Sequence, residues 1–574
     1  MSLNVSPTRV VKVMDPRLKL SNERVFAAIQ GGRVISGQTF PATVINNSSL
    51  AITCNPPSRG VAISRRVRKR FRYDISITGT NTGGGPLLNP GYYGPRNMPI
   101  AMTTISESWQ LENDTVTQQP IQQYAQCLQW YHNDFDVRNR EYGESPSMLD
   151  QFQNYADGAN SIRNPLGGYG DNSYETTRAG FSQFQVLTNP VGGGGGTATL
   201  TLICTEDTYV SPFVFGKDSE YSSALVGINN MTYTATFGNL ANVMSLVQNQ
   251  GVPGVVNITA VTVDLKSAEL LFNYITPQIT ETLPSSLVSP YFSPILYPFN
   301  YNQTIAPGGS VSITLGNVQV TSIPQRMYIF AGPAQSAKTP YISDSYMALS
   351  PIGNPIQLTW NNNQYLSSMT AQQLYDMSIK NGLRMSWTQF SNFVGSIVCI
   401  EFGTDIGLDA NEAIGTLGNY QLNVTANFIN TNSSLSIVPT LYVLVVSSGT
   451  FNVVNGACSH MLGVLSSADV LNAQVDPNIN YQKAESAYGG AFFDSLKKGL
   501  SKLHQYAKDK KLISKGLAQF GPKGKVASEI AEKLGYGVVA GRMPKKRSLA
   551  SRLKGRGIEN LDENESESDE YSEE

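Results

Sequence analysis

The sequence predicts a mainly β protein made of two consecutive β-sandwiches with short inserted helices, followed by a charged tail. Short runs that are apolar or alternate with polar residues recur between clusters of Gly, Pro and Asn, as strands and turns do. Charged residues make up only 15% of the chain, below the usual quarter or so, while 51 glycines and 30 prolines supply turns. A length of 574 residues is too great for one core and suits two or three domains.

The predicted strands lie in both halves of the chain. Regularly spaced short strands with turn clusters between them indicate a sandwich or a jelly roll. The clearest runs cover residues 49–54, 71–77, 197–204, 255–265, 310–315, 326–331, 396–402 and 440–446.

Two helices are expected among these strands, at 120–130 and 371–381. Pro120 fits the first position of a helix. Thr370 and Gln373 form a capping-box pattern, and Gly382 suits a left-handed stop. Each helix begins 11 residues after a tryptophan, Trp109 or Trp360. We interpret this spacing as a weak internal repeat with one sandwich in each half, although strand–turn–helix units also recur by chance.

The boundary between the sandwiches is expected near 276–298, where five prolines should break any regular element. The predicted limits are therefore an N-terminal arm at 1–20, a first sandwich at 21–280 and a second at 281–456. A basic amphipathic helical tail at 457–556 and an acidic, disordered tip at 557–574 complete the chain.

Charge is strongly segregated in this tail. Residues 491–556 hold 17 Lys and Arg against 4 Asp and Glu, and residues 557–574 hold 9 Asp and Glu with no Lys or Arg. Such a layout indicates a function and is no requirement of folding. The basic segment suits nucleic acid, a membrane surface or an acidic protein groove, and a plain solvated helix is the structural alternative.

Catalytic and metal-binding patterns are weak. Five dispersed cysteines argue against a disulfide framework and predict buried free thiols, hence folding in a reducing compartment. Three scattered histidines support neither a triad nor a zinc site. Asp405, Asp409 and Glu412 fit either a cation site or a turn. No enzyme activity and no cofactor are predicted.

The sequence resembles the double jelly-roll major capsid proteins of eukaryotic double-stranded DNA viruses, particularly those of virophages and polinton-like viruses. The order and spacing of several segments, over about 20–456, carry the resemblance. They are 211–215, 227–230, 269–277, 323–330, 395–402, 403–408, 418–424, 441–443 and 449–451.

The resemblance implies two consecutive eight-stranded jelly rolls and a subunit that trimerises. Three copies of two rolls would form a pseudo-hexameric capsomer that tiles an icosahedral shell. The implied partners are further copies of the chain and penton or minor capsid proteins. The implied location is the virion, after synthesis in the host cytoplasm and assembly in a viral factory or the nucleus.

Two hypotheses concern the tail. We expect its basic groups to face inward and to contact genomic DNA or an inner membrane, through Lys497, Lys498, Lys502, Lys510, Lys511, Lys545, Lys546 and Arg547. The segment around Arg556 and Gly557 resembles a site cut by adenovirus-type maturation proteases. Cleavage there would release the acidic tip and uncover the basic segment.

Two rival functions remain open from the sequence. A minor vertex or glycan-binding receptor protein could also use a β-sandwich, and low copy number in particles would distinguish it. A β-sandwich hydrolase is disfavoured because the sequence lacks a nucleophile or paired-carboxylate pattern, although distant carboxylates such as Asp134 and Glu141 leave it open.

Overall fold

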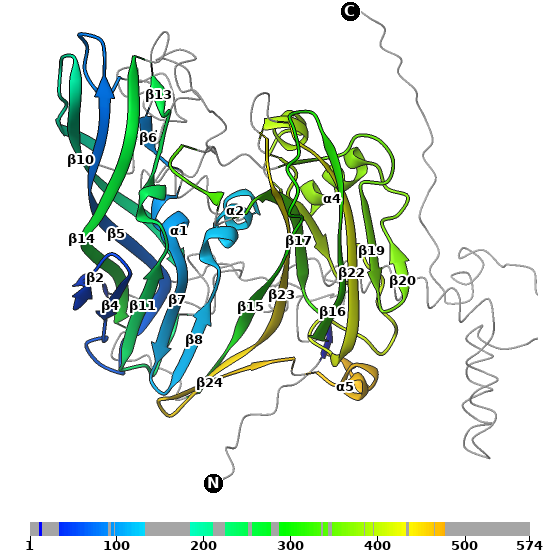
Figure 1. The fold of residues 1–574 in the computed structure, drawn as a ribbon. Coiled ribbons are helices and arrows are strands. Elements are labelled where there is room, and N and C mark those ends of the chain that lie inside the picture. The colour runs from blue at the N-terminus through cyan, green and yellow to red at the C-terminus, as the bar shows by residue number, and fades with distance from the viewer. Residues whose placement is uncertain are drawn as a thin grey trace, which may run out of the picture. The chain divides into compact units, whose positions relative to one another are not determined.

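The computed structural model describes residues 11–13 and 34–476, with gaps at 90–92, 97, 132–183, 210–223, 251–254, 277–285, 335–336, 342–346, 384, 394, 432–435 and 464. These residues form two β-sandwiches that lie side by side (Figure 1). The predicted mainly β class with two consecutive jelly rolls is confirmed.

The first jelly roll consists of a six-stranded and a five-stranded sheet. The larger sheet has the order β13-β14-β5-β10-β9, with β2 also paired to β14, and the smaller has the order β3-β4-β11-β7-β8. Together the two sheets contain more than the eight strands expected for the roll, because short extra strands lie at their edges. The strands are β2 Val34–Pro41, β3 Val44–Ile45, β4 Ser49–Thr53, β5 Ala62–Asn81, β7 Thr104–Leu111, β8 Asp114–Gln118, β9 Phe184–Thr188, β10 Gly194–Tyr209, β11 Met231–Phe237, β13 Asn249–Gln250 and β14 Val256–Thr276.

The second jelly roll consists of two five-stranded sheets. The inner sheet, which faces the first roll in Figure 1, has the order β15-β23-β17-β21 with β24 paired to β23. The outer sheet has the order β16-β22-β19-β20 with β18 paired to β22. The strands are β15 Ser286–Asn300, β16 Ser310–Ser322, β17 Arg326–Pro333, β18 Ala348–Leu349, β19 Ile356–Trp360, β20 Asn363–Tyr365, β21 Val398–Glu401, β22 Leu417–Ile429, β23 Pro439–Val454 and β24 Ala457–Leu462.

Shorter elements join and cover these sheets. Strands β6 and β12, far apart in the chain, form a two-stranded antiparallel sheet, and β1 pairs in parallel with β25. The elements are β1 Val11–Val13, β6 Tyr93–Pro95, α1 Pro99–Thr103, α2 Ile121–Tyr131, η3 Leu240–Val243, β12 Met244–Leu246, α4 Ala371–Lys380, the π-helical turn η5 Gln389–Phe393, α5 Ser467–Asn472 and β25 Gln474–Asp476.

The burial of the strands follows their sequence pattern. Buried and exposed residues alternate along β11 and β16, because one face of each strand meets a core and the other meets water. Strand β23 is buried on both faces over nearly all its length. It lies between the second core and the first roll, so its run of apolar residues shows no alternation.

The internal repeat is confirmed. In each roll a hairpin precedes the helix, β7–β8 before α2 and β19–β20 before α4. The tryptophan of each hairpin packs on a tyrosine of the neighbouring strand: the ring centroids of Trp109 and Tyr233 are 4.8 Å apart, and those of Trp360 and Tyr420 are 5.2 Å apart. Thr370 and Gln373 form the predicted capping box, and Gly382 has a φ of +101°.

The expectation that prolines break all regular structure up to residue 298 is wrong. Strand β15 contains Pro290, Pro294 and Pro298. Tyr301 donates its backbone N–H to the carbonyl of Pro439 on β23, so odd-numbered residues of β15 face that partner and even-numbered ones face away. All three prolines therefore lie where an N–H would point away from β23, and no bond of the β15–β23 ladder is lost.

The predicted tail is wrong in its first twenty residues. Residues 457–476 hold β24, α5 and β25. Asn455 and Gly456 have φ angles of +50° and +82°, as a two-residue hairpin turn requires, and they fold β24 back onto β23. The predicted N-terminal arm likewise contains a strand, β1, paired with β25.

The edge prolines should suppress pairing between the β15 edges of different copies. We expect Pro298→Thr, at an exposed position, to restore an outward N–H group and to increase concentration-dependent light scattering several-fold. Circular dichroism should show an unchanged β fold. The control is Pro57→Thr, in the exposed loop between β4 and β5. Equal scattering by Pro298→Thr and the wild type would refute this role.

Candidate assembly site at the junction of the two jelly rolls

Helix α2 belongs to the first roll in sequence and to the second roll in packing. Its side chains Ile121, Cys127, Trp130 and Tyr131 are buried in one cluster with the core of the second roll. The hydroxyl of Tyr131 donates to the carbonyl of Ile397, 2.5 Å away. Its ring lies edge-on to that of Tyr328, with centroids 5.1 Å apart. The helix therefore fastens one roll to the other.

The face that receives α2 carries a buried ion pair. Arg326 on β17 lies 3.4 Å from Glu401 on β21, and both side chains are less than 10% exposed. Burial raises the pKa of the neighbouring Tyr328 hydroxyl and the Cys399 thiol, so both stay neutral at physiological pH. Since desolvation offsets much of the attraction in such a pair, its main effect is on how the helix and the sheet align.

The second roll also extends into the first. Phe451, Val453 and Cys458 share a buried cluster with the first roll's core. Asn113, at the β7–β8 turn, donates its amide to the carbonyl of Cys458 (3.1 Å) and accepts the Cys458 backbone N–H (2.8 Å). One side-chain amide thus reproduces the two-way pairing of a β-ladder and holds β24 against the first roll.

A histidine reinforces this contact. The Nδ1 atom of His460 on β24 lies 2.7 Å from Oδ2 of Asp114, and the imidazole stacks on Tyr291 with centroids 5.0 Å apart.

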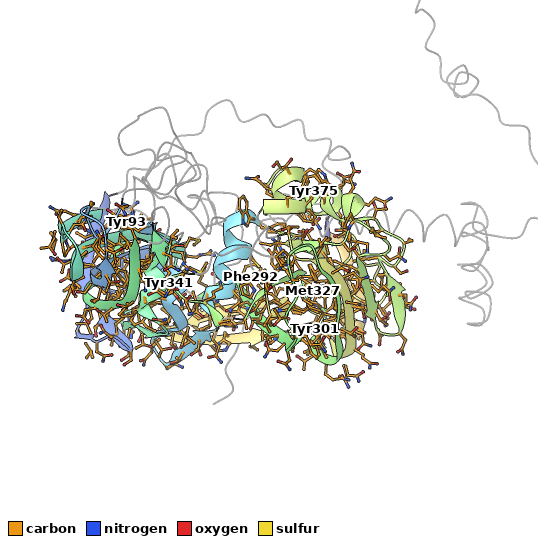
Figure 2. The ribbon with its side chains drawn as sticks, turned by 45° about the horizontal axis from the view of Figure 1, so that its top comes forward. Tyr93, Phe292, Tyr301, Met327, Tyr341 and Tyr375 are labelled. Atoms are coloured by element: carbon orange, nitrogen blue, oxygen red, sulfur yellow. The ribbon has the colours of Figure 1, made fainter. Side chains whose placement is uncertain are left out.

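A third connection follows β17. The guanidinium of Arg96, fully buried between the rolls, donates to the carbonyl of Thr339 at 2.9 Å, and the N–H of Leu246 donates to the carbonyl of Pro340 at 2.8 Å. Tyr341 packs against the first core, and Figure 2 shows it among the strands of the first roll. The predicted limit at 280/281 therefore divides the strands but not the cores, because each roll contributes side chains to the other.

A cluster of buried charge underlies the junction. On the inner face of the first roll, the ammonium of Lys69 is paired with Glu107, which also accepts the Tyr233 hydroxyl at 3.2 Å. Glu206 on β10 accepts the backbone N–H groups of Ile100 (2.7 Å) and Ala101 (3.1 Å) at the start of α1. Helix α1 packs on α2, so Glu206 stabilises α2 indirectly by holding the start of α1.

The predicted tail residues lie outside the described part of the chain. This applies to Arg556, Gly557 and the eight basic residues from Lys497 to Arg547. No helix in the part of the chain that the structure describes has the length and apolarity needed to cross a membrane. The five cysteines are free and buried, as predicted.

The carboxylates around residue 405 form a turn. Asp405 accepts the amide of Asn381 at 2.7 Å and the N–H of Glu401 at 2.8 Å, while Glu412 accepts the N–H of Asp409 at 3.1 Å. Across the described ranges no three His, Cys, Asp or Glu side chains gather as metal ligands would. Of the two alternatives left open by the sequence, the hydrogen bonds favour the turn.

Sequence comparison connects this double roll to a known group of coat proteins. A family profile described as the Sputnik virophage major capsid protein 1st domain matches residues 6–275. Another, the major capsid protein V20 C-terminal domain, matches residues 296–394 and 391–449. Capsid protein V20 of Sputnik virophage is 30% identical over 579 residues, covering 94% of this chain and 95% of that protein.

The chain belongs to the virophage major capsid protein family. A solved structure of the Sputnik virophage gives a TM-score of 0.72 at 28% identity, covering 85% of this chain and 100% of that one. The mavirus major capsid protein gives 0.62 at 12% identity, with coverages of 82% and 100%, and supports the fold alone. This virophage capsid protein is therefore a self-associating structural component of an icosahedral virion shell and not an enzyme.

The stability of the capsid protein should depend on pH through Glu206. Burial is the main cause that raises the pKa of this carboxyl from 4.5 to about 7. Between these values the unfolded chain releases a proton that the folded chain keeps, so the free energy of unfolding falls as pH rises. The fall should total about 3 kcal/mol and end above pH 7.

The test is chemical denaturation from pH 4.5 to 8. We expect Glu206→Gln to remove most of this slope, whereas the control Glu269→Gln, on the half-exposed part of β14, should keep it. An unchanged slope in Glu206→Gln would show that another group carries the effect.

Removal of the Tyr131 side chain from α2 should destabilise the second roll. We expect Tyr131→Ala to cost about 3–5 kcal/mol in unfolding free energy, and Tyr131→Phe, which loses only a hydrogen bond, about 1 kcal/mol. Hydrogen exchange should accelerate in β17 and β21, far away in sequence. Trp387→Ala, at a side chain 40% exposed, is the control. Faster exchange confined to the first roll would contradict the assignment of α2.

Proposed function

We propose that three copies of this capsid protein form a capsomer with a pseudo-hexagonal outline, and that these capsomers tile the icosahedral shell. The observation that carries this proposal is the exchange of core elements between the two rolls. Because α2 is buried in the second core and residues 451–458 in the first, one chain presents two similar sandwiches in a fixed relation. Three such chains supply six sandwiches, the number that a hexagonal outline needs.

The surface composition supports close packing between copies. Burying charge at an interface is costly, and interface cores are depleted in charged residues. Only 15% of the chain is charged, and much of this charge lies in the tail. The walls of the rolls instead carry hydroxyl pairs, such as Thr78 with Thr197 at 3.0 Å and Ser106 with Thr236 at 2.6 Å.

Analytical ultracentrifugation and electron microscopy of the purified full-length chain test the capsomer. We expect a species of three times the mass of the 62.3 kDa chain, with six lobes in projection. Monomers at all salt and calcium concentrations, or rings of another order, would refute the trimer.

For the tail, we propose that the basic segment 491–556 faces inward and contacts phosphate groups of packaged DNA or of an inner membrane. Its charge of 17 basic against 4 acidic residues supports this role, because neutralised phosphates release counterions. We further propose that a maturation protease cuts between Arg556 and Gly557. The acidic tip, with 9 carboxylates, would shield the basic segment until then.

We also propose synthesis in the host cytoplasm, assembly in a viral factory or the nucleus, and contact with penton or minor capsid proteins. The five reduced, buried thiols fit folding in a reducing compartment.

Mass spectrometry of mature particles tests the tail. We expect the C-terminal peptide to end at Arg556. After ultraviolet crosslinking, DNA adducts should appear on the basic residues between Lys497 and Arg547. An intact Glu574 would refute cleavage, and lipid adducts in place of DNA adducts would identify the membrane as the phosphate source.

A further inference from the structure

A cleft of about 550 Å³ opens where the two rolls meet. The first roll contributes the start of β7, the start of α2 and the turn before η3. The second contributes the end of β15, the start of β23 that pairs with it, and the segment after β17. The lining consists of Ile105, Pro120, Gln122, Gln123, Gly238, Asn239, Asn242, Leu296, Pro298, Asn300, Ala334, Lys338, Thr440 and Tyr442.

The cleft suits an uncharged, partly apolar occupant that carries peptide groups. Apolar side chains such as Leu296 and Pro298 lie beside amides, the one charged group of the lining, Lys338, is only 7% exposed, and the lining contains no carboxylate. Ile105 leaves 42% of its surface to solvent. The exposed amides of Asn239 and Asn300 in the lining can exchange hydrogen bonds with a peptide backbone.

The turn at 350–354, between β18 and β19, has the opposite shape. At its tip Ile352 is 82% exposed, more than any other large apolar side chain in the described ranges. The hydroxyl of Ser350 donates to the carbonyl of Ile352 at 3.1 Å and accepts its N–H at 3.3 Å, and Gly353 has a φ of +77°. The isoleucine is thus held out in one conformation, so little entropy is lost when it binds.

The turn and the cleft lie on opposite sides of the second roll and at the same end of it. Asn427, near the end of β22 in the outer sheet, pairs with both ends of the turn through Ser350 and Pro355. Thr440 and Tyr442 line the cleft from the start of β23 in the inner sheet, ten residues or so further along the chain. Copies standing side by side would therefore bring one turn level with the next cleft.

Ring symmetry requires two surfaces of this kind. A ring with an odd number of copies cannot be built from two-fold contacts, so each copy must offer two different, complementary surfaces. We propose that, in the capsomer, the Ile352 turn of one copy inserts into the cleft between the rolls of the next copy. This proposal rests on the trimer proposed above and names its contact.

Site-directed crosslinking of the full chain tests the contact. Ile105→Cys and Ile352→Cys each place one exposed thiol on one of the two surfaces, and the five native thiols are buried. A short bis-maleimide should join the two single variants only when they are mixed. The double variant should give covalent trimers on a denaturing gel. The matched control pairs Ile105→Cys with Leu417→Cys, a position 54% exposed at the other end of β22, and should give no product.

A second variant measures the strength of the contact. Ile352→Asp should weaken capsomer formation at least tenfold in sedimentation, while Ile352→Val should keep most of it. Trimers that form without the mixed crosslink, or single variants that crosslink to themselves, would overturn this contact and leave the trimer standing. Absence of any trimer in the wild type would instead overturn the proposed capsomer.

Discussion

The burial of α2 in the neighbouring roll is the contact on which the rest of the molecule depends. The repeat supplies each roll with a hairpin and a helix, but the two helices are used differently. Helix α4 stays with its own roll, where the Cys399 backbone N–H donates to Ser378 at 3.3 Å. Helix α2 crosses over, and Tyr131 reaches the backbone of Ile397 instead. A duplicated element has thus become the connection between the duplicates, and the fixed relation of the two rolls follows from it.

The junction combines apolar burial with a few buried charges, and these have different effects. The buried aromatic side chains of α2, Trp130 and Tyr131, contribute favourable free energy because large apolar area leaves water. The pairs Lys69–Glu107 and Arg326–Glu401 gain little net energy once desolvation is included, but they penalise misaligned packing. Glu206 is different, since it holds the first amides of α1 while burial disfavours its charge.

Much of this architecture could be predicted from local patterns. Strand alternation, the capping box at Thr370 and a helix soon after Trp109 and Trp360 depend on neighbouring residues and are confirmed, although the helices begin 12 and 11 residues after these tryptophans. The β24 hairpin was missed although Asn455-Gly456 is a strong signal for a two-residue turn. The prolines of β15 misled because only the sheet order shows that the strand lies at an edge. The junction could not be predicted, since nothing in the sequence of α2 specifies which core it enters.

The partner of Tyr131 lies 266 residues further along the chain. At a synthesis rate of about 5–20 residues per second, the ribosome needs roughly 13–53 seconds to deliver it. Throughout that interval the first roll carries an apolar helix whose binding surface does not yet exist. The first roll therefore cannot complete its packing during translation, because α2 stays exposed until the second roll has been synthesised. A nascent chain with an exposed α2 can instead place this helix on the second roll of a finished copy, which is a route to domain swapping.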